Sequence, residues 1–308
     1  MKKEIIGYCV LLFFILLLIV FFIVGWLLFI PLPYKNNVTV NQIENFCNFF
    51  SEEEVEIGSI YDKTGTLYHY IKSNQDDSKP ADIYVYYPTA VRSESYKLYP
   101  QTHSNIDLVT CDFDLEHFQP KKMEAYFVNG KYEVTKVCEA LYTDNTVKTI
   151  LKNEVKAPLK YGAMPLFNIN IDFVDLITMI PFLKDKTKDF SFGMMNTNCS
   201  TRIDILKSIL GLNKQINMYV GKADCKFIEE SIYKSKKCYI FDLVVNGYEN
   251  LDGKIYIDTE NYDVIEINTK NCGNPNYKSF KFSLAEKNKI SVNEWNKLKE
   301  KLAHEYIK

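Results

Sequence analysis

An uninterrupted apolar segment near the N-terminus constrains this chain more than any other feature. Residues 8–30 read YCVLLFFILLLIVFFIVGWLLFI, and no charged residue occurs from Ile5 to Tyr34. About 20 apolar residues in a helix span the roughly 30 Å hydrocarbon core of a bilayer. A cleaved secretory signal has a shorter apolar region that ends in small residues, and residues 26–31 offer no such site. The sequence therefore predicts an uncleaved transmembrane anchor within residues 1–34.

Basic residues beside this segment predict its orientation. Lys2 and Lys3 precede it, and Lys35 alone follows it closely. Because basic residues near a span stay in the cytoplasm, we expect a cytoplasmic N-terminus and a single pass through the inner (plasma) membrane. No second apolar stretch of about 18 residues follows. The rest of the chain is then expected in the periplasm or outside the cell.

Composition excludes two classes of protein. Apolar residues make up 47% and charged residues 25% of the 308 residues, as in globular domains, so wholesale disorder is excluded. The 37 basic residues are balanced by 39 acidic residues, whereas a nucleic-acid-binding protein is expected to be clearly basic. We therefore expect the membrane, but no nucleic acid, among the partners.

The cysteines suggest a disulfide but no metal site. Seven of them follow the predicted span, where an extracytoplasmic location permits disulfides, and the odd number leaves at least one thiol unpaired. Cys225 and Cys238 lie on the two expected arms of one hairpin and form the candidate disulfide. No C-x-x-C or H-x-x-x-H spacing occurs, so we expect neither a metal site nor another cofactor.

After a stalk with a short helix (residues 35–53), most of the chain is rich in β-branched and aromatic residues, which favour β-strands. Asn129-Gly130 predicts a two-residue hairpin turn, because both turn positions need positive φ. We expect an extracytoplasmic β domain over residues 54–286. Its expected strands are Glu54–Tyr61, Thr66–Ile71, Asp82–Tyr87, Ile106–Phe113, Met123–Val128, Lys131–Tyr142, Thr146–Val155, Gln215–Glu229, Lys237–Asn246, Gly253–Asp258, Val264–Thr269 and Tyr277–Leu284.

Three helical patterns interrupt or follow these strands. Apolar spacing predicts one helix from about Phe173, which Pro181 should end or kink, and a second from Ser200 to about Leu210. The C-terminal residues 287–308 begin their periodic pattern with a capping box, S-x-x-E, at Ser291 and continue as an amphipathic helix. That helix either packs on its own sheet or binds a partner.

Together these patterns predict a mainly β (α+β) fold. We expect a curved antiparallel sheet or open half-barrel with two inserted helices, preceded by one transmembrane helix and followed by the amphipathic helix. A curved sheet that does not close must cover its concave apolar face, and either helices or a hydrophobic ligand can do so.

Searches for catalytic motifs name no catalytic residue. The Ser231–Lys234 run matches S-x-x-K and the Lys63–Gly65 run matches K-T-G, two elements of penicillin-recognising enzymes. Their order along the chain is reversed, no S-D-N occurs, and both runs fall in expected turns. We therefore expect a protein that is not an enzyme.

The stretch from about Gly58 to Leu284 resembles the periplasmic families built on an open half-barrel, the LolA/LolB-like lipoprotein carriers and a related bacterial domain of unknown function. The points of likeness are YPTAVRSESYKLYP at 87–100, PLFNINIDFVDLITMIPFL at 165–183 and GKIYIDTENYDVIEI at 253–267. Unlike those carriers, which are soluble or lipid-anchored, this chain has a predicted protein anchor. The resemblance implies a concave surface that holds an acyl chain or another apolar group.

Two functional hypotheses follow. In the first, the β domain binds an apolar or lipid-like ligand or an envelope component, unless the inserted helices fill the concave face completely. In the second, a structural or scaffold protein binds another envelope protein through its tail helix or sheet edge, with no small ligand. The candidate lining residues for the first hypothesis belong to the inserted helices or their entrance: Phe167, Phe173, Ile177, Ile180, Leu206 and Ile209.

Overall fold

The computed structural model divides the chain into two units, one of Met1–Lys35 with Asn198–Ile216 and one of Asn36–Thr197 with Asn217–Lys308. The structure describes only residues of the second unit: 62–74, 79–99, 106–114, 119–143, 146–151, 154–155, 159–160, 168–170, 174–195, 219–246, 251–270 and 279–307. The predicted anchor (1–34), the stalk, the strand at 54–61 and the second inserted helix lie outside these residues. No helix within the described ranges has the length and apolar character needed to cross a bilayer.

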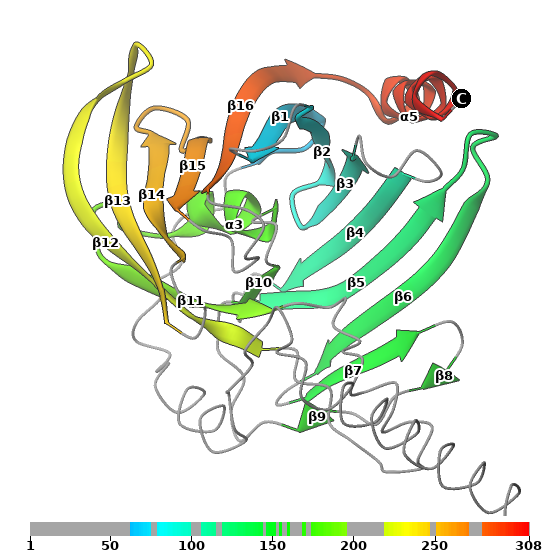
Figure 1. Ribbon diagram of the computed structural model, residues 1–308, viewed down its shortest axis with the longest axis horizontal. Helices are drawn as coiled ribbons and strands as arrows, with labels where there is room; N and C mark the ends of the chain where they lie inside the picture. Colours follow the sequence, from blue (N-terminus) through cyan, green and yellow to red (C-terminus); the bar gives the residue numbers. More distant parts are fainter. Residues whose placement is uncertain are drawn as a thin grey trace, which may run out of the picture. The chain divides into compact units, whose positions relative to one another are not determined.

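A single open sheet of 16 strands forms the described unit (Figure 1). Its order is β10-β11-β12-β13-β14-β15-β16-β1-β2-β3-β4-β5-β6-β7-β8, and β9 also pairs with β7. The strands are β1 Thr66–Asn74, β2 Ala81–Thr89, β3 Arg92–Leu98, β4 Ile106–Asp114, β5 Gln119–Val128, β6 Val134–Thr143, β7 Thr146–Leu151, β8 Glu154–Val155, β9 Leu159–Lys160, β10 Asn168–Asn170, β11 Phe190–Met195, β12 Tyr219–Tyr233, β13 Lys236–Asn246, β14 Leu251–Asp258, β15 Val264–Lys270 and β16 Ser279–Lys289.

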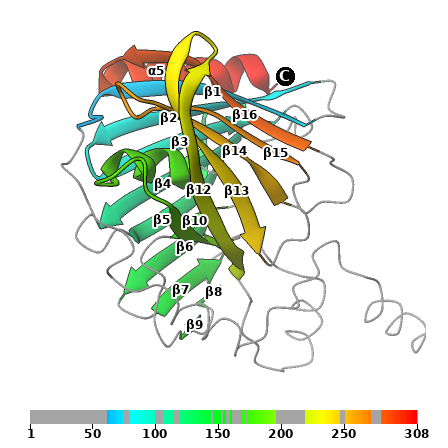
Figure 2. The ribbon, with the colours of Figure 1, turned by 90° about the vertical axis from the view of Figure 1, so that its left-hand side faces the viewer.

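Two meanders build this sheet, β1 to β7 and β11 to β16, and the antiparallel pairing of β1 with β16 joins them. Pairing is antiparallel throughout the described strands except between β10 and β11, which run parallel. The curvature of the sheet is plain in two perpendicular views (Figures 1 and 2). The predicted mainly β, antiparallel and open architecture is confirmed.

The two described helical segments lie on opposite faces of the sheet. The first comprises α3 (Val174–Met179) and the 3-10 turn η2 (Ile180–Phe182), and the second is α5 (Val292–Tyr306). Adjacent residues of β2 contact them: the Tyr87 hydroxyl lies 2.8 Å from Thr178 Oγ1, whereas Tyr86 stacks on Trp295. Successive side chains of a strand point to opposite faces, so α3 lies on the inner face and α5 on the outer face (Figure 1).

Pro181 divides the first inserted helix as the sequence predicted. The α-helical part ends at Met179, and a 3-10 turn with proline near its start continues to Phe182. Proline lacks the N–H that an α-helical hydrogen bond would need, and a 3-10 turn is a usual way to end such a helix. The result is a nine-residue helical segment on the inner face.

The tail helix packs on its own sheet. Ser291 and Glu294 form the predicted capping box, with the Ser291 side chain accepting from the Glu294 N–H and the Glu294 side chain accepting from the Ser291 N–H. Trp295 is 1% exposed, and its Nε1 donates to Glu94 Oε2 at 2.8 Å. The apolar side of α5 is therefore used within the domain. The cluster that buries it comprises Leu67, Tyr86, Tyr96, Leu98, Ile106, Leu108, Val128, Trp295 and Ala303.

The Asn129-Gly130 hairpin forms with a different turn from the predicted one. The Asn129 N–H donates to the Glu133 carbonyl, which encloses a three-residue loop, and the residue with positive φ is Tyr132 at 61°. The Asn129 side chain accepts from the N–H groups of Lys131 and Glu133, each at 3.0 Å. A Cβ on Gly130 would lie 3.1 Å from Ile307. Glycine is needed at position 130 because the residue that follows α5, Ile307, lies too close for a side chain there.

The turn between β12 and β13 gives a first stability prediction. Lys234 and Ser235 have φ of 47° and 64°, and a left-handed backbone costs a non-glycine residue about 1 kcal/mol. Ser235→Gly is therefore expected to raise the free energy of unfolding by about 0.5 to 1 kcal/mol, measured by urea unfolding. Ser231→Gly, within β12, is the matched control and should lower it. Equal effects of the two substitutions on the free energy of unfolding would show that the backbone at Ser235 is not strained.

Candidate functional site

The two faces of β12 to β16 differ sharply in chemistry. One cross-strand row on the inner face, here called the inner row, is apolar on all five strands. The neighbouring row on the outer face, the outer row, is polar on all five. The inner row comprises Phe227, Phe241, Ile255, Ile267 and Phe282, and the outer row comprises Lys226, Asp242, Lys254, Asn268 and Lys281.

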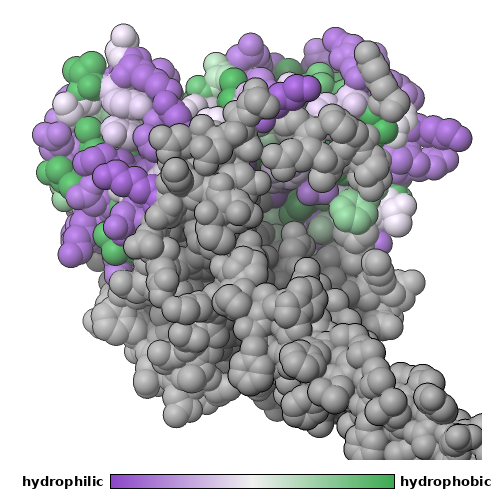
Figure 3. All heavy atoms as spheres, viewed as in Figure 1, coloured by the Kyte–Doolittle hydropathy of each residue, from purple (hydrophilic) through white to green (hydrophobic). Residues whose placement is uncertain are grey.

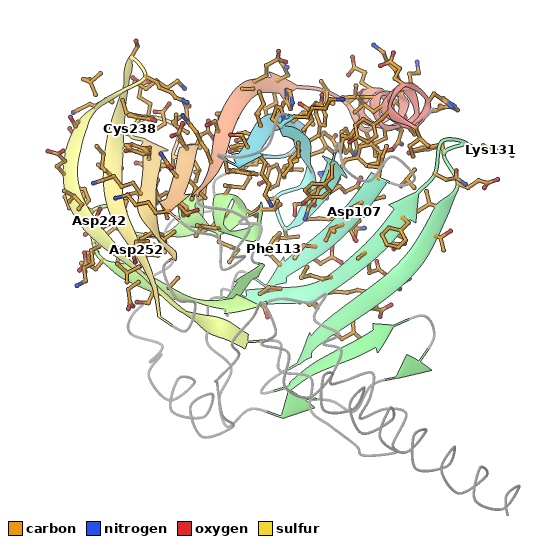
Figure 4. The ribbon with its side chains drawn as sticks, in the orientation of Figure 1. Asp107, Phe113, Lys131, Cys238, Asp242 and Asp252 are labelled. Carbon is orange, nitrogen blue, oxygen red and sulfur yellow. The ribbon has the colours of Figure 1, made fainter. Side chains whose placement is uncertain are left out.

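Burial follows the same division. Phe241, Ile255, Ile267 and Phe282 are each 0% exposed, and Phe227 is half-buried. On the outer row Lys254 forms an exposed ion pair with Asp242, which lies with Asp252 on the side of β13 and β14 away from α3 (Figure 4). The visible surface of the described residues is mostly hydrophilic, with hydrophobic residues scattered over it (Figure 3). The apolar surface of these strands therefore faces inward.

On the other meander, strand β3 presents polar side chains on the inner face. On β3, Ser93, Ser95 and Lys97 are 2%, 2% and 6% exposed. Asp107, opposite Lys97 on β4, has a pKa that burial raises and that the Lys97 charge partly lowers again. The inner face thus changes from apolar at β12 to β16 to polar at β3 and at Asp107 of β4, whereas Val109 and Cys111 of β4, opposite Ser95 and Ser93, are apolar.

Charged and aromatic side chains meet on the inner side of β1 and β2. We call this group, Lys63, Tyr68, Tyr87, Asp263 and Lys287, the Lys63 cluster. Lys63 is 3% exposed, and its Nζ lies 5.0 Å from the ring centroid of Tyr68 and 5.2 Å from that of Tyr87. The Asp263 carboxylate is 1% exposed; it accepts from the Tyr68 hydroxyl at 2.7 Å and from Lys287 Nζ at 2.6 Å.

The Lys63 cluster holds the last turn of α3. Lys63 Nζ donates to the Ile177 carbonyl at 3.2 Å, and the next residue, Thr178, is bonded to the Tyr87 hydroxyl. The last carbonyls of a helix have no partner within the helix, and a cation stabilises that end. Lys63 therefore acts as a buried cap for a helix that lies 114 residues further along the chain.

An aromatic path connects the Lys63 cluster with the inner row. The rings of Tyr68 and Tyr70 stack at 6.2 Å, and Tyr70 stacks on Phe282 of the inner row at 4.5 Å. The Tyr70 hydroxyl donates to the Val264 carbonyl at 3.1 Å. The polar cluster and the apolar row are thus parts of one continuous buried layer.

Burial dominates the electrostatics of the Lys63 cluster. It lowers the pKa of the Lys63 amine to about 8; the Asp263 charge opposes this shift and the Lys287 charge adds to it. Burial, with the Asp263 charge, raises the pKa of Tyr68 and Tyr70 well above the usual value. The tyrosines therefore stay neutral, and the cluster holds two lysines against one carboxylate.

Lys63→Met is expected to raise the free energy of unfolding at pH 7 by about 1 to 2 kcal/mol. A pKa lowered from 10.5 to about 8 means that charging the buried amine costs about 3 kcal/mol. Loss of the hydrogen bond to Ile177 offsets about 1.5 kcal/mol of that gain. Urea unfolding of both proteins measures the difference.

The effect should depend on pH. Below pH 8 the amine is protonated in the folded and unfolded states, so the cost is fully present. Between about pH 8 and 10.5 the unfolded chain holds the proton and the folded chain releases it, so wild-type stability rises toward that of the variant. A difference between the two proteins that is the same at pH 7 and pH 10 would contradict the charge penalty.

The outer face holds a second charged cluster, which is structural. Glu266 is 0% exposed and accepts from the Tyr233 hydroxyl at 2.8 Å and from Ser283 at 2.9 Å, while Lys234 Nζ lies 2.7 Å away. Burial raises the Glu266 pKa, but these hydrogen bonds outweigh burial and the pKa is lowered. The contacts fix the β12–β13 turn against β15.

The predicted lining residues are only partly within the described ranges. Ile177 and Ile180 are 1% and 0% exposed and lie on the inner face in α3 and η2. Phe167, Phe173, Leu206 and Ile209 lie outside the described residues. That the six form a ligand-binding surface stays a prediction.

The structure corrects the disulfide expectation. Cys225 and Cys238 lie on the two arms of the β12–β13 hairpin as predicted, but Cys225 is opposite Leu243 and Cys238 is opposite Ser231. Five residues of β13 separate these positions, about 16 Å at about 3.3 Å per residue, too far for an S–S bond. Both are buried free thiols, and burial raises the pKa of each.

Sequence reasoning missed the Lys63 cluster. The sequence predicts Lys63 in a turn, as part of the K-T-G run, and Asp263 falls between the expected strands Gly253–Asp258 and Val264–Thr269. The two come together only because β1 pairs with β16 and the β14–β15 turn reaches Tyr68 across 195 residues of sequence. No local signal marks such a contact.

Among the described residues, no group of three His, Cys, Asp or Glu residues is arranged to hold a metal ion.

Comparisons with known proteins do not assign this chain to a family. No protein-family model matches the chain, and no curated protein matches it. Solved structures with detectable similarity include a beta-barrel-like protein of a domain of unknown function from Brucella abortus, LprF from Mycobacterium bovis and a LolA superfamily protein from Nitrosomonas europaea. These include the families that the sequence resembles.

All three likenesses are distant. The Brucella protein is 7% identical with a TM-score of 0.40, and the match covers 76% of this chain and 99% of that one. LprF is 10% identical with a TM-score of 0.21, covering 80% and 92%. The Nitrosomonas protein is 7% identical with a TM-score of 0.25, covering 82% and 94%. Such scores carry no argument about what this chain binds.

Proposed function

We propose that this chain is an envelope protein that is anchored in the inner membrane by its N-terminal span and binds an apolar or lipid-like chain on the inner face of its extracytoplasmic sheet. It performs no catalysis in this proposal. The single observation that carries the proposal is the inner row: five neighbouring strands present apolar side chains inward and polar side chains outward.

The physical reason lies in the cost of exposing such a surface. Apolar surface removed from water contributes about 25 cal/mol per Å², so a continuous apolar row requires a cover. Within the described part of the chain, one nine-residue helical segment, α3 with η2, lies on this face. Four of the five row residues are 0% exposed without a ligand, so an apolar chain binds there by taking the place of the part of the protein that covers the row, and it does so without needing hydrogen-bond partners. A curved sheet is a common scaffold for such sites.

Photolabelling of the full chain in its own membrane tests this proposal. The probe is palmityl alcohol carrying a diazirine in its chain, and peptide mapping locates the adducts after irradiation. We expect adducts on peptides of β12 to β16 that decrease when excess unlabelled palmityl alcohol is present. Adducts confined to residues 8–30, or labelling that does not saturate, would overturn the proposal.

A matched pair of variants sharpens the test. Phe227→Gln places a polar group at the half-buried end of the inner row. An unpaired amide that faces an apolar chain costs about 1 to 2 kcal/mol, which corresponds to about a tenfold loss of affinity. Labelling of the β domain should therefore fall about tenfold. Lys226→Gln, its neighbour on the outer row, should leave labelling unchanged. Equal labelling of the two variants would remove the inner row as the binding surface.

A further inference from the structure

The Lys63 cluster carries more positive than negative charge in a buried place. Lys63 Nζ and Lys287 Nζ lie 5.0 and 5.4 Å from the centroid of the same Tyr68 ring. Asp263 accepts from Lys287 and Tyr68, and within the described chain the Ile177 carbonyl is the hydrogen-bond acceptor of Lys63. An ammonium group has three donors. Lys63 is therefore a buried cation whose hydrogen-bonding capacity exceeds what its neighbours use.

We propose that the Lys63 cluster binds the anionic head group of a single-chain lipid, a carboxylate of the fatty-acid class, whose chain lies along the inner row. This inference rests on the proposed function, because the inner row is the surface that holds the chain. It adds the chemical class of the ligand and the residues that select it, Lys63 and Lys287.

Charge favours an anion at this place. A carboxylate near both ammonium groups forms charge-assisted hydrogen bonds, which are about twice as strong as neutral ones. Burial strengthens the attraction, because the effective dielectric constant there is below that of water. Lys287 is 33% exposed and so gives a head group access from solvent, while Lys63 is the buried donor behind it.

Geometry places the chain next to the head group. Tyr68 of the cluster stacks on Tyr70, and Tyr70 stacks on Phe282, the first residue of the inner row on this side. From Phe282 to Phe227 the row crosses four strand spacings of about 4.8 Å, or about 19 Å in all. This is comparable with the length of an extended palmitoyl chain. The inner face becomes polar beyond β2, at Ser95 and Lys97, so the charged end belongs on that side.

Binding of the head group exchanges one contact of Lys63 for another. Because Lys63 is 3% exposed, a carboxylate reaches its Nζ only when the last turn of α3 moves away and the bond to the Ile177 carbonyl breaks. The last turn of α3 then keeps the bond between Thr178 and Tyr87 but loses its buried cap. Opening of α3 and binding of the anion are therefore coupled, and hydrogen exchange of residues 174–182 should become faster when the ligand binds.

Paired photolabels test the head-group preference in the full chain. Palmitic acid and palmityl alcohol, each with the same diazirine, are added to membranes containing the wild type, Lys63→Met, Lys287→Met or Lys254→Met. The acid should label the β domain of the wild type about tenfold more than the alcohol. Lys63→Met and Lys287→Met should abolish that preference, whereas Lys254→Met, a lysine of the outer row, should keep it.

The outcomes separate this inference from the proposed function. Saturable labelling of β12 to β16 by acid and alcohol alike, unchanged in Lys63→Met and Lys287→Met, would overturn the head-group assignment and leave the apolar binding surface in place. Labelling by neither probe would overturn both. Because Lys63→Met is expected to be more stable than the wild type, loss of labelling in that variant is not explained by unfolding, and a urea unfolding curve on the same sample verifies this.

Hydrogen exchange gives an independent readout and separates a lipid from a free anion. Palmitate should speed exchange at residues 174–182 of the wild type, and palmityl alcohol and acetate should not. Acetate carries the carboxylate without the chain. Faster exchange with acetate would assign the site to small anions and overturn the lipid inference, and no change with palmitate would overturn the coupling to Lys63.

Discussion

Trp295→Ala is expected to lower the free energy of unfolding by about 3 to 5 kcal/mol, the usual cost of removing a buried tryptophan side chain. Trp295 is 1% exposed. It stacks on Tyr86 at 5.4 Å, contacts the edge of Tyr96 at 6.1 Å, and donates to Glu94. Alanine removes these ring contacts and the Nε1 hydrogen bond, while Glu94 keeps its bond from Lys299 Nζ. Urea unfolding of the full chain, followed by circular dichroism, measures the loss.

Val292→Ala is the matched control for this prediction. Val292 belongs to the same helix but is 49% exposed, and a surface substitution of this kind changes stability by about 0.5 kcal/mol or less. Deletion of residues 291–308 should cause a cooperative loss of structure in β1 to β5. If Trp295→Ala or the deletion has no effect on stability, α5 does not belong to the core and is available for a partner protein.

Asp263→Asn is expected to lower the free energy of unfolding at pH 7 by about 3 kcal/mol, because removing one partner of a buried ion pair leaves uncompensated charge. Asp263 is 1% exposed and is the carboxylate that Lys287 and Tyr68 contact. Its charge also raises the pKa of Lys63, so the variant should release the Lys63 proton at a lower pH. The loss of stability should therefore shrink above pH 8.

Asp242→Asn provides the comparison on the outer row. Its carboxylate is 45% exposed and pairs with Lys254 at 3.1 Å, and exposed pairs contribute about 1 kcal/mol or less. Urea unfolding of both variants at pH 7 and pH 10 tests the contrast. A similar small loss for the two aspartates would show that the Lys63 cluster is not the buried electrostatic centre that its geometry indicates.

Local sequence signals were enough for elements that local forces determine. The S-x-x-E pattern and the apolar spacing of the tail predicted α5, because capping and amphipathicity are contained within a few residues. The alternation GKIYID predicted most of β14. Strand β3, RSESYKL, was missed because its inward residues are serine and lysine rather than apolar side chains. Its burial is set by neighbouring strands and not by its own composition.

The candidate site was harder to predict than the fold. Inward positions of β12 to β16 were visible as strand patterns, but the inner row requires the register of four strand pairings, including the bulges in β12–β13 and β14–β15. A bulge shifts which residues share a face. Lys63, Tyr68 and Asp263 come from both meanders, and only the β1–β16 pairing brings them together. Long-range pairing of this kind leaves no trace in the spacing of residues.

The central claim is that an apolar chain binds along the inner row. An experimental structure of the full chain, prepared with saturating palmitic acid, tests it most directly. The account predicts continuous ligand density over Phe282, Ile267, Ile255 and Phe241, with the carboxylate at Lys63 and Lys287. An inner face filled by the protein's own side chains at saturating ligand, or ligand density on the outer face, would contradict it.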